Sequence, residues 1–512
     1  MIEGEAVRLA ELLKGLDIVQ VDGDTAVDIA DVCYDSRKCR PASLFVAVPG
    51  LKADGHDYIA QAQGLGAKAV VLERPCSVPP GVTVVRVSDS RRSLGVLGKN
   101  FYGNPSRGLC IVGVTGTSGK TTITYLLESI FSAAGFKAGV LGTVNYRFGG
   151  KTMPAPNTTP ESLELQRMLR EMADAGVQKV VMEVSSHSLE LRRVDDCEFD
   201  IGIFTNLSQE HLDYHSTMED YFLAKRRFFD TLLDGRKDGR KYRMIVNADD
   251  PWGGRLLQEV QGKVLTFAME KTADVSAGKA SFSVEGIEAE LKTPGGALSV
   301  RSALIGRFNL SNILAAAAAA FALDIPAESI RAGIGNLKTI PGRLEKITSL
   351  KGPSVFVDYA HKEAALRGVL ENLSLFKKGR FITVFGCGGD RDRQKRPLMG
   401  KAAVTFSDLT ILTSDNPRSE DPMEIIREIE RGINSGVARK LETSDLSDRG
   451  EKGYLIIPDR RAAIHLAIGI AGRNDMVLIA GKGHETYQII GSRTVPFDDR
   501  TVAGEALAAR GH

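Results

Sequence analysis

The sequence predicts an α/β fold with parallel sheets, divided into three domains. Apolar, strand-like runs alternate with helical patterns along almost all of the 512 residues, which is typical of parallel sheets covered by helices. A chain of this length exceeds one core of ordinary size, so two to four domains are expected. At 113–122 a glycine-rich segment, GVTGTSGKTT, stands between a predicted strand and a predicted helix. Such a segment indicates a phosphate-binding loop.

Two breaks in the pattern give the domain boundaries. NFYGNPSRG is rich in glycine, proline and asparagine, and NLKTIPGRLE carries a turn after a long helical region. Cutting there predicts domains over 1–107, 108–337 and 338–512, each of ordinary size. The alanine-rich run at 314–323 predicts a closely packed helix. The first sixteen residues, MIEGEAVRLAELLKGL, predict an amphipathic helix.

The composition argues against several classes of function. Lys and Arg number 66 and Asp and Glu number 64, so neither nucleic acid nor a membrane surface is an expected partner. We find no apolar run that could span a bilayer and no signal peptide. The six cysteines form no CxxC pair, which favours reduced thiols in a cytoplasmic protein and no zinc site.

The glycine loop has the groups that a nucleoside triphosphate requires. Its backbone N–H groups and the following helix N-terminus attract phosphate, Lys120 adds positive charge, and Thr121 offers a hydroxyl to Mg²⁺. The pattern departs from GxxxxGK[ST] by one position, because Val114 replaces the first glycine and Gly113 precedes it. The flanking strand and helix favour a phosphate loop over a chance glycine turn.

Three later segments contain candidate metal ligands. VVMEVSSHSLE predicts a buried strand that ends at Glu183, whose carboxylate suits Mg²⁺; an ordinary serine-rich turn is an equal alternative. FTNLSQEHLDYH contains His211, but without a cysteine nearby the residues alone favour a structural histidine. YFLAKRRFFD predicts a helix bearing Lys225, which is either a solvated lysine or, only if carbamylated, a metal ligand.

The last domain repeats one pattern of a strand followed by a polar loop. The three copies are FITVFGCGGDRDRQKRP, LTILTSDNPRSEDP and MVLIAGKGHET. In an open parallel sheet, ligands bind beyond the carboxyl ends of the strands. We therefore expect the three loops to lie at one rim and face one site.

Taken in order, these motifs resemble the Mur ligase family. The resemblance rests on DSRKCRPASLFVAVPGLKADGH, GVTGTSGKTT, NTTP, EVSSH, NLSQEHLDYH, the Lys225 helix, GRFNLSN, PGRLE, VDYAH, GCGGDRD, SDNPRSEDP and GKGHE, and it covers nearly the whole chain. It implies a central P-loop ATPase-type domain between an N-terminal UDP-sugar-binding domain and a C-terminal, Rossmann-like, amino-acid-binding domain. It also implies a monomeric, ATP-dependent amide ligase of peptidoglycan precursor synthesis that forms an acyl phosphate with Mg²⁺.

The resemblance assigns roles to individual residues. ATP would be bound by Gly116, Thr117, Ser118, Gly119, Lys120, Thr121, Thr122, Asn309, Arg343 and Asp358. The implied metal ligands are Thr121, Glu183, His211 and carbamylated Lys225, and the implied catalytic residues are Lys120, Glu183, His211 and Lys225. The UDP-N-acetylmuramoyl-dipeptide would be bound by Ser36, Arg37, Leu51, Lys52, Ala53, Asn157, Thr158, Thr159, Ser185 and Arg193. Two positions depart from the family pattern: HKEA begins at His361, and Leu191 replaces a common glutamine.

The DNPR motif resembles that of members which add meso-2,6-diaminopimelate. This amino acid is lysine with an extra carboxylate at its far end, which Arg418 could bind through two parallel hydrogen bonds. Asp415 and Glu485 could take the far ammonium. The implied set is Arg391, Asp415, Asn416, Pro417, Arg418, Gly481 and Glu485. Without the family context, an Asx-Pro turn would also explain DNPR.

Other functions fit the residues less well. A lysine-adding relative should differ at DNPR, and a folylpolyglutamate synthase should lack both DNPR and the N-terminal DSR…LFVAVPG…DGH module. An ATP-binding regulatory protein without ligase activity should have lost one of Lys120, Glu183, His211 or Lys225, and all four are present. A nucleic-acid motor is disfavoured by the balanced charge.

Overall fold

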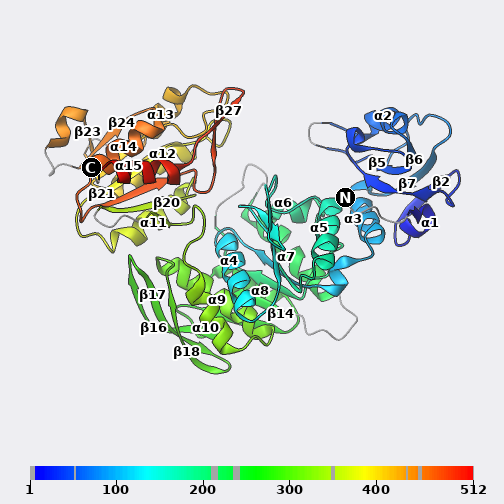
Figure 1. Cartoon of the computed structure of the whole chain (residues 1–512), viewed down its shortest axis with the longest axis horizontal. Helices are drawn as coiled ribbons and strands as arrows, with labels where there is room; N and C mark the ends of the chain where they lie inside the picture. The colour runs from blue at the N-terminus through cyan, green and yellow to red at the C-terminus, as the bar shows by residue number, and fades with distance from the viewer. Residues whose placement is uncertain are drawn as a thin grey trace. The chain divides into compact units, whose positions relative to one another are not determined.

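The computed structural model describes residues 6–50, 53–208, 217–234, 243–347, 352–433, 436–447 and 452–510 (Figure 1). The chain divides into two compact units. The first comprises Met1–Ser276, Lys292–Leu298 and Asn312–Gly333, and the second comprises Ala277–Leu291, Ser299–Ser311 and Ile334–His512. The larger sheets are mostly parallel and alternate with helices, which confirms the predicted α/β fold.

A five-stranded sheet lies in the N-terminal part of the first unit. Its order is β2-β7-β6-β5-β4, and β2 is an antiparallel edge strand. The elements are β1 (Val7–Arg8), α1 (Leu9–Leu12), β2 (Ile18–Asp22), β3 (Asp28–Ile29), β4 (Asp31–Cys33), β5 (Ser43–Val46), α2 (Ile59–Gly64), β6 (Ala67–Leu72), β7 (Thr83–Val87) and α3 (Ser90–Phe101). Short 3₁₀ turns occupy Ser36–Lys38, Gly55–Tyr58 and Pro105–Gly108.

The helix predicted over the first sixteen residues is wrong for its described part. Val7 and Arg8 pair with Ile29 and Asp28 as a two-stranded ladder, and helix α1 has only four residues. The N–H of Leu9 donates to the carbonyl of Val27, 2.9 Å away. Backbone hydrogen bonds to a later segment therefore replace the first helical turns, although Leu9 is still buried as the apolar pattern requires.

The central sheet contains eleven strands in the order β11-β10-β9-β12-β8-β13-β14-β15-β16-β17-β18. Its strands are β8 (Cys110–Thr115), β9 (Ala138–Leu141), β10 (Tyr146–Phe148), β11 (Lys151–Met153), β12 (Lys179–Glu183), β13 (Ile201–Phe204), β14 (Arg243–Asn247), β15 (Val264–Ala268), β16 (Val275–Ser283), β17 (Gly286–Thr293) and β18 (Gly296–Ser302). Its helices are α4 (Lys120–Ala133), α5 (Ser162–Asp174), α6 (Ser186–Glu190), α7 (Met218–Asp234), α8 (Pro251–Glu259), α9 (Arg307–Ala322) and α10 (Ala327–Asn336). Helix α9 is buried from Ile313 to Ala320, which confirms the predicted close packing.

Strand β8 explains why the central motifs meet. It pairs in parallel with β12 on one side and with β13 on the other. Covered on both faces, these strands are continuously apolar rather than alternating. Their carboxyl ends lie at one edge of the sheet, so the glycine loop, Glu183 and Thr205 come together there.

The C-terminal sheet has seven strands in the order β19-β20-β25-β21-β22-β24-β23. The elements are β19 (Glu345–Ile347), β20 (Ser354–Asp358), α11 (Glu363–Ser374), β21 (Phe381–Phe385), α12 (Lys395–Phe406), β22 (Leu409–Leu412), α13 (Pro422–Glu430), β23 (Arg439–Lys440), β24 (Gly453–Ile456), α14 (Arg460–Ile470), β25 (Met476–Ala480), β26 (Tyr487–Ile490), β27 (Arg493–Pro496) and α15 (Asp499–Ala509), with a 3₁₀ turn at Thr443–Ser447. Figure 1 shows helices α11 to α15 packed around this sheet.

Alternation along β25 shows how both faces are filled. Leu478 joins the core formed with α11, α12 and α13, whereas Val477 and Ile479 join the core formed with α14 and α15. Strands β20, β25, β21 and β22 run parallel, so their following loops share one rim. In the part of the chain that the structure describes, no helix has the length and apolarity to cross a membrane.

Candidate functional site

The glycine loop joins β8 to α4 in a conformation that requires two of its glycines. Gly116 has φ 138° and Gly119 has φ 89°, and a β-carbon on Gly116 would lie 1.9 Å from Thr205 Oγ1. Asn206 fixes the loop from the end of β13: its carbonyl accepts from Thr117 N and its side chain accepts from Ser118 N. The Lys120 ammonium lies over the loop and donates to the carbonyl of Gly116, 2.7 Å away. The predicted strand, loop and helix are thus confirmed.

Glu183 ends β12 as a buried carboxylate with three donors around it. Thr121 Oγ1 donates to its Oε1 over 2.9 Å, and Thr143 donates through both its backbone N and its Oγ1 over 2.9 Å. The structure therefore brings Thr121 and Glu183, the two residues expected to bind one Mg²⁺, within hydrogen-bond distance of each other. Sequence reasoning missed Thr143, although its place two residues after β9, the strand beside β12, was a usable signal.

Lys225 is buried on α7 and points at the glycine loop. Only 1% of the residue is exposed, and its Nζ lies 3.1 Å from Gly116 O and 3.4 Å from Thr115 Oγ1. Burial, aided by the positive charge of Lys120, lowers the pKa of Lys225 well below its ordinary value. The solvated lysine considered from the sequence is therefore wrong, because the apolar face of α7 carries Lys225 into the core.

Several of the residues expected to bind the muramoyl-dipeptide lie near Glu183 in the fold. Thr158 Oγ1 lies 3.2 Å from Thr143 Oγ1, and Asn157 O accepts from the Tyr146 hydroxyl. Thr159 Oγ1 donates to Glu183 O and accepts from Ser185 N. Farther along, the Arg193 guanidinium donates to Thr159 O and to Glu161.

The expected N-terminal ligands lie in the first unit but are already engaged. Ser36 is buried and donates to Gln61 Oε1 over 2.7 Å. Arg37 is held by Asp35 through two hydrogen bonds. Ala53 O accepts from Gly50 N over 3.0 Å. The predicted site residues Leu51, Lys52 and His211 lie outside the described residues.

Asp358 ends β20 and organises the turn that follows. Its carboxylate accepts from Leu344 N and Ala360 N, and burial raises its pKa although the charge of Arg343 opposes this. Arg343 lies over the Tyr359 ring, 4.7 Å from its centroid. In the second unit the third expected nucleotide ligand, Asn309, is buried and donates to Ile305 O.

The unusual HKEA segment forms an ordinary helix start. His361 Nδ1 lies 2.8 Å from Tyr359 O, and α11 begins two residues later at Glu363. Burial lowers the pKa of His361 to about 4, so this imidazole is neutral at physiological pH.

The three C-terminal loops meet at one rim, as predicted. Asn416 Nδ2, after β22, donates to Glu485 Oε2, after β25, over 2.9 Å. The Lys482 ammonium lies between them and contacts Asp415 Oδ1 at 3.4 Å, Asn416 Oδ1 at 3.1 Å and Glu485 Oε2 at 3.0 Å. Lys482 is fully buried, and sequence reasoning missed it. Its position two residues after an entirely apolar strand was the available signal.

Arg418 reaches the loop after β21 from the DNPR turn. Its φ is 52°, and its Nη1 donates to Gly389 O over 2.8 Å. Gly389 has no room for a side chain, because a β-carbon there would lie 1.9 Å from Pro417 O. A β-carbon on Gly388 would meet both Arg418 Nη1 and Arg391 Cγ, so the two guanidinium-bearing residues lie on the same side of this loop.

Gly481 is held in place by a buried ion pair below it. Its φ is 119°, and its N–H donates to Asp358 O. Arg460 and Asp499 are both inaccessible, form two hydrogen bonds of 2.8 and 2.7 Å, and Arg460 also donates to Ala480 O. The strand end that presents Gly481, Lys482 and Glu485 is therefore rigidly supported.

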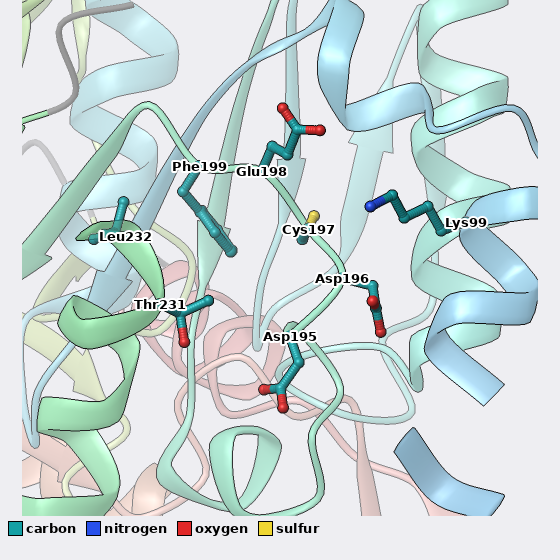
Figure 2. Close-up of a pocket in the computed structure, with 8 residues that line it drawn as sticks. All are labelled: Lys99, Asp195, Asp196, Cys197, Glu198, Phe199, Thr231 and Leu232. Carbon is teal, nitrogen blue, oxygen red and sulfur yellow. The ribbon is translucent and has the colours of Figure 1, made fainter. Parts of the chain in front are cut away.

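One cavity of about 120 Å³ lies apart from these groups, between α3, the end of α7 and the segment before β13 (Figure 2). None of the predicted site residues lines it. Its lining is Lys99, Asp195, Asp196, Cys197, Glu198, Phe199, Thr231 and Leu232. Burial raises the pKa of Asp196 to about 6, although Lys99 lowers it in part.

The raised pKa of Asp196 predicts that the stability of the protein depends measurably on pH. A folded pKa above the ordinary 3.8 disfavours the ionised group, so wild-type stability falls as pH rises from about 4 through 6. Asp196→Asn should raise the free energy of unfolding by about 3 kcal/mol at pH 7.5 and by only about 1 kcal/mol at pH 4.5. Urea unfolding at both pH values measures this. The control Asp195→Asn loses ion pairs to Arg192 and Arg227 and should not stabilise; equal effects of Asp196→Asn at both pH values would contradict the account.

Three family models match the chain in sequence. The Mur ligase family catalytic domain matches residues 28–102, the Mur ligase middle domain 114–320, and the Mur ligase glutamate ligase domain 342–483. A protein of Geobacter metallireducens is 48% identical over 502 residues, which is 98% of each chain. One of Caldanaerobacter subterraneus is 43% identical over 502 residues, covering 98% of this chain and 99% of its own. Both bear the name UDP-N-acetylmuramoyl-L-alanyl-D-glutamate--2,6-diaminopimelate ligase.

Solved structures agree with these relatives. A structure of a UDP-N-acetylmuramoyl-L-alanyl-D-glutamate--2,6-diaminopimelate ligase superposes with a TM-score of 0.70 at 31% identity, covering 99% of this chain and all of that one. The MurF ligase of Thermotoga maritima, solved in complex with ADP, has a TM-score of 0.62 at 20% identity over 94% of this chain and 96% of its own, and shows the fold alone. The glycine loop, the buried Glu183 and the three-loop rim occur here in one chain that these sequences match end to end. The chain belongs to the Mur ligase family.

Proposed function

We propose that this chain is the ATP-dependent ligase that adds meso-2,6-diaminopimelate to UDP-N-acetylmuramoyl-L-alanyl-D-glutamate in peptidoglycan precursor synthesis. Relatives of that name match at 40–48% identity over at least 98% of this chain. The observation in the structure that carries the proposal is the rim where Arg418 stands beside Asp415, Asn416 and Glu485. It offers cationic and anionic groups to an amino acid with both charges at its far end.

The reaction has two steps. A carboxylate oxygen of the glutamyl substrate attacks the γ-phosphorus of ATP, the bond to the bridging oxygen breaks, and ADP leaves. The amine of diaminopimelate then attacks the acyl carbon, phosphate leaves with the bonding electrons, and the amine loses a proton. A free carboxylate is a poor acyl donor, so phosphoryl transfer supplies the driving force. Both steps gather negative charge, which cations must stabilise.

The glycine loop is well formed for the first step. The N–H groups at the start of α4 would donate to phosphate oxygens, and Lys120, which now donates to Gly116 O, would add a positive charge there. Thr121 and Glu183 offer a hydroxyl and a carboxylate oxygen, the hard donors that Mg²⁺ prefers. In the described residues no three His, Cys, Asp or Glu side chains form a metal cluster, and Mg²⁺ needs no such cluster because water and phosphate complete its shell. When bound, Mg²⁺ would neutralise charge on the transferring phosphoryl group.

Lys225 is proposed to act as a carbamate. An ammonium at this place would repel a metal, whereas its lowered pKa leaves the neutral amine that carbon dioxide requires. The carbamate would then serve a second metal together with His211. The burial of Lys225 next to Gly116 supports this assignment.

The remaining assignments follow the same resemblance. Ser36, Arg37, Ala53 and the 157–159 segment are proposed to bind the UDP-sugar dipeptide, with Ser185 and Arg193. Asn309, Arg343 and Asp358 are proposed to contact the nucleotide. We also propose domain boundaries at 107/108 and 337/338, and a cytoplasmic monomer.

Arg418 provides the test of the amine site. Arg418→Ala should lower kcat/KM for meso-diaminopimelate by about 10²-fold, because a carboxylate loses a charged, two-pronged partner. The KM values for ATP and the UDP-dipeptide should change less than about twofold. Phosphate release measures all three. The control Arg427→Ala removes an exposed guanidinium from α13 and should leave every constant unchanged. A similar loss in both variants, or none in Arg418→Ala, would argue against this amine site.

A further inference from the structure

The rim contains a buried cation, Lys482, that lies between the carboxylates of Asp415 and Glu485. Lys482 has no exposed surface, although lysine is almost never fully buried without a partner. Its three N–H groups face three oxygens, on Asp415, Asn416 and Glu485. Burying such a charge is costly unless it is paired in this way. The free-energy cost of burying this charge indicates that Lys482 has a role in the chemistry of the site.

Lys482 also fixes the orientation of its neighbours. Asn416 Oδ1 accepts from Lys482 and from Ile489 N, so its Nδ2 must face Glu485 Oε2. Without the ammonium, two carboxylates and one amide would share this small volume, and the carboxylates would repel each other. The amide orientation and the Glu485 rotamer therefore depend on Lys482.

Lys482 offsets part of the negative charge that Asp415 and Glu485 bring to the rim. Further positive charge at the rim comes from Arg418 and Arg391, and from Lys395, whose hydrogen bond to the neutral His361 O does not cancel its charge. Arg460 is paired with Asp499. Without Lys482, the surroundings of the two carboxylates would be more negative by one charge.

We propose that Lys482 is a specificity-determining residue, which sets the rim for an amino acid whose far end is a zwitterion rather than a lone ammonium. Diaminopimelate has one ammonium and one carboxylate at that end, so a site with separated negative and positive groups fits it. Lysine has only the ammonium, which a more negative site would favour. The inference rests on the proposed function. It goes beyond the role of Arg418, because it assigns control of the charge at the rim to Lys482, which lies between Asp415 and Glu485.

The test compares selectivity rather than activity alone. For each protein, kcat/KM is measured with meso-diaminopimelate and with L-lysine, and the ratio of the two is taken. Lys482→Met, which keeps the volume and removes the charge, should lower this ratio by about 30-fold, mostly through the KM for diaminopimelate. Adding Glu485→Gln to Lys482→Met restores the wild-type net charge and should recover at least part of the ratio. Lys440→Met, an exposed control, should leave it unchanged.

Asp415→Asn removes a negative charge, the opposite of the change in Lys482→Met, and it keeps Lys482 in place. It should raise the ratio by about tenfold, since a rim that is more positive by one charge disfavours a lone ammonium more than a zwitterion. This variant decides the matter if Lys482→Met does not fold. Equal losses with both amino acids in Lys482→Met, or a ratio that falls or stays constant in Asp415→Asn, would overturn the inference. Absence of wild-type turnover with diaminopimelate would instead overturn the proposed function.

Discussion

Glu183→Gln is expected to lower the rate of phosphate release by about 10³-fold at saturating substrates. The substitution removes the negative charge that, with Thr121, is proposed to bind Mg²⁺. It also places an amide N–H₂ against the Thr143 N–H, which now donates to the carboxylate over 2.9 Å. The loss should be accompanied by a higher Mg²⁺ concentration for half-maximal rate, because a metal site with one ligand fewer binds more weakly.

Glu190→Gln is the matched control for this variant. Glu190 ends the adjacent helix α6 and is exposed, so the same change in charge should leave both rate and Mg²⁺ dependence within about twofold. A Glu183→Gln enzyme that kept its rate and its Mg²⁺ dependence would show that the metal is bound elsewhere.

Lys225→Ala is expected to cost about 10²-fold or more in the rate, and acetate should restore part of it. The physical reason is that the proposed carbamate acts as a carboxylate, and truncation leaves a space beside Gly116 that a small carboxylate can enter. Phosphate release measured with and without acetate tests both expectations. Sodium chloride at equal ionic strength is the solvent control, and Lys263→Ala, on the exposed segment before β15, is the control variant.

The alternative hypothesis, that Lys225 acts as an unmodified amine, predicts a different result for the same variant. If Lys225 acted only as an amine, then methylamine rather than acetate would restore the rate. Rescue by methylamine alone would therefore contradict the carbamate, while leaving a catalytic role for this side chain. A variant with the wild-type rate would remove Lys225 from the mechanism.

Much of the site was predictable because its parts are local or follow from sheet topology. The strand, glycine loop and helix at 113–122 needed only hydrophobic pattern and glycine positions. The C-terminal rim needed only the rule that parallel strands present their loops at one edge, and the contacts of Asn416 with Glu485 and of Arg418 with Gly389 confirm it.

The remainder depended on tertiary contacts that have no local signature. Whether Lys225 and Lys482 were buried could not be decided from flanking residues, because lysine is usually solvated. Thr143 lies far from Glu183 in the sequence and meets it only because β9 and β12 are neighbours. The short strand at Val7 replaced a predicted helix since Ile29 and Val27 offered competing backbone hydrogen bonds.

The most direct test of the account is the choice of amine. Phosphate release from ATP would be measured with UDP-N-acetylmuramoyl-L-alanyl-D-glutamate and either meso-diaminopimelate or L-lysine. We expect rapid turnover with diaminopimelate and a kcat/KM for lysine lower by about 10³-fold or more, because lysine leaves Arg418 without a carboxylate. Equal turnover with the two amino acids, or turnover with lysine alone, would contradict it.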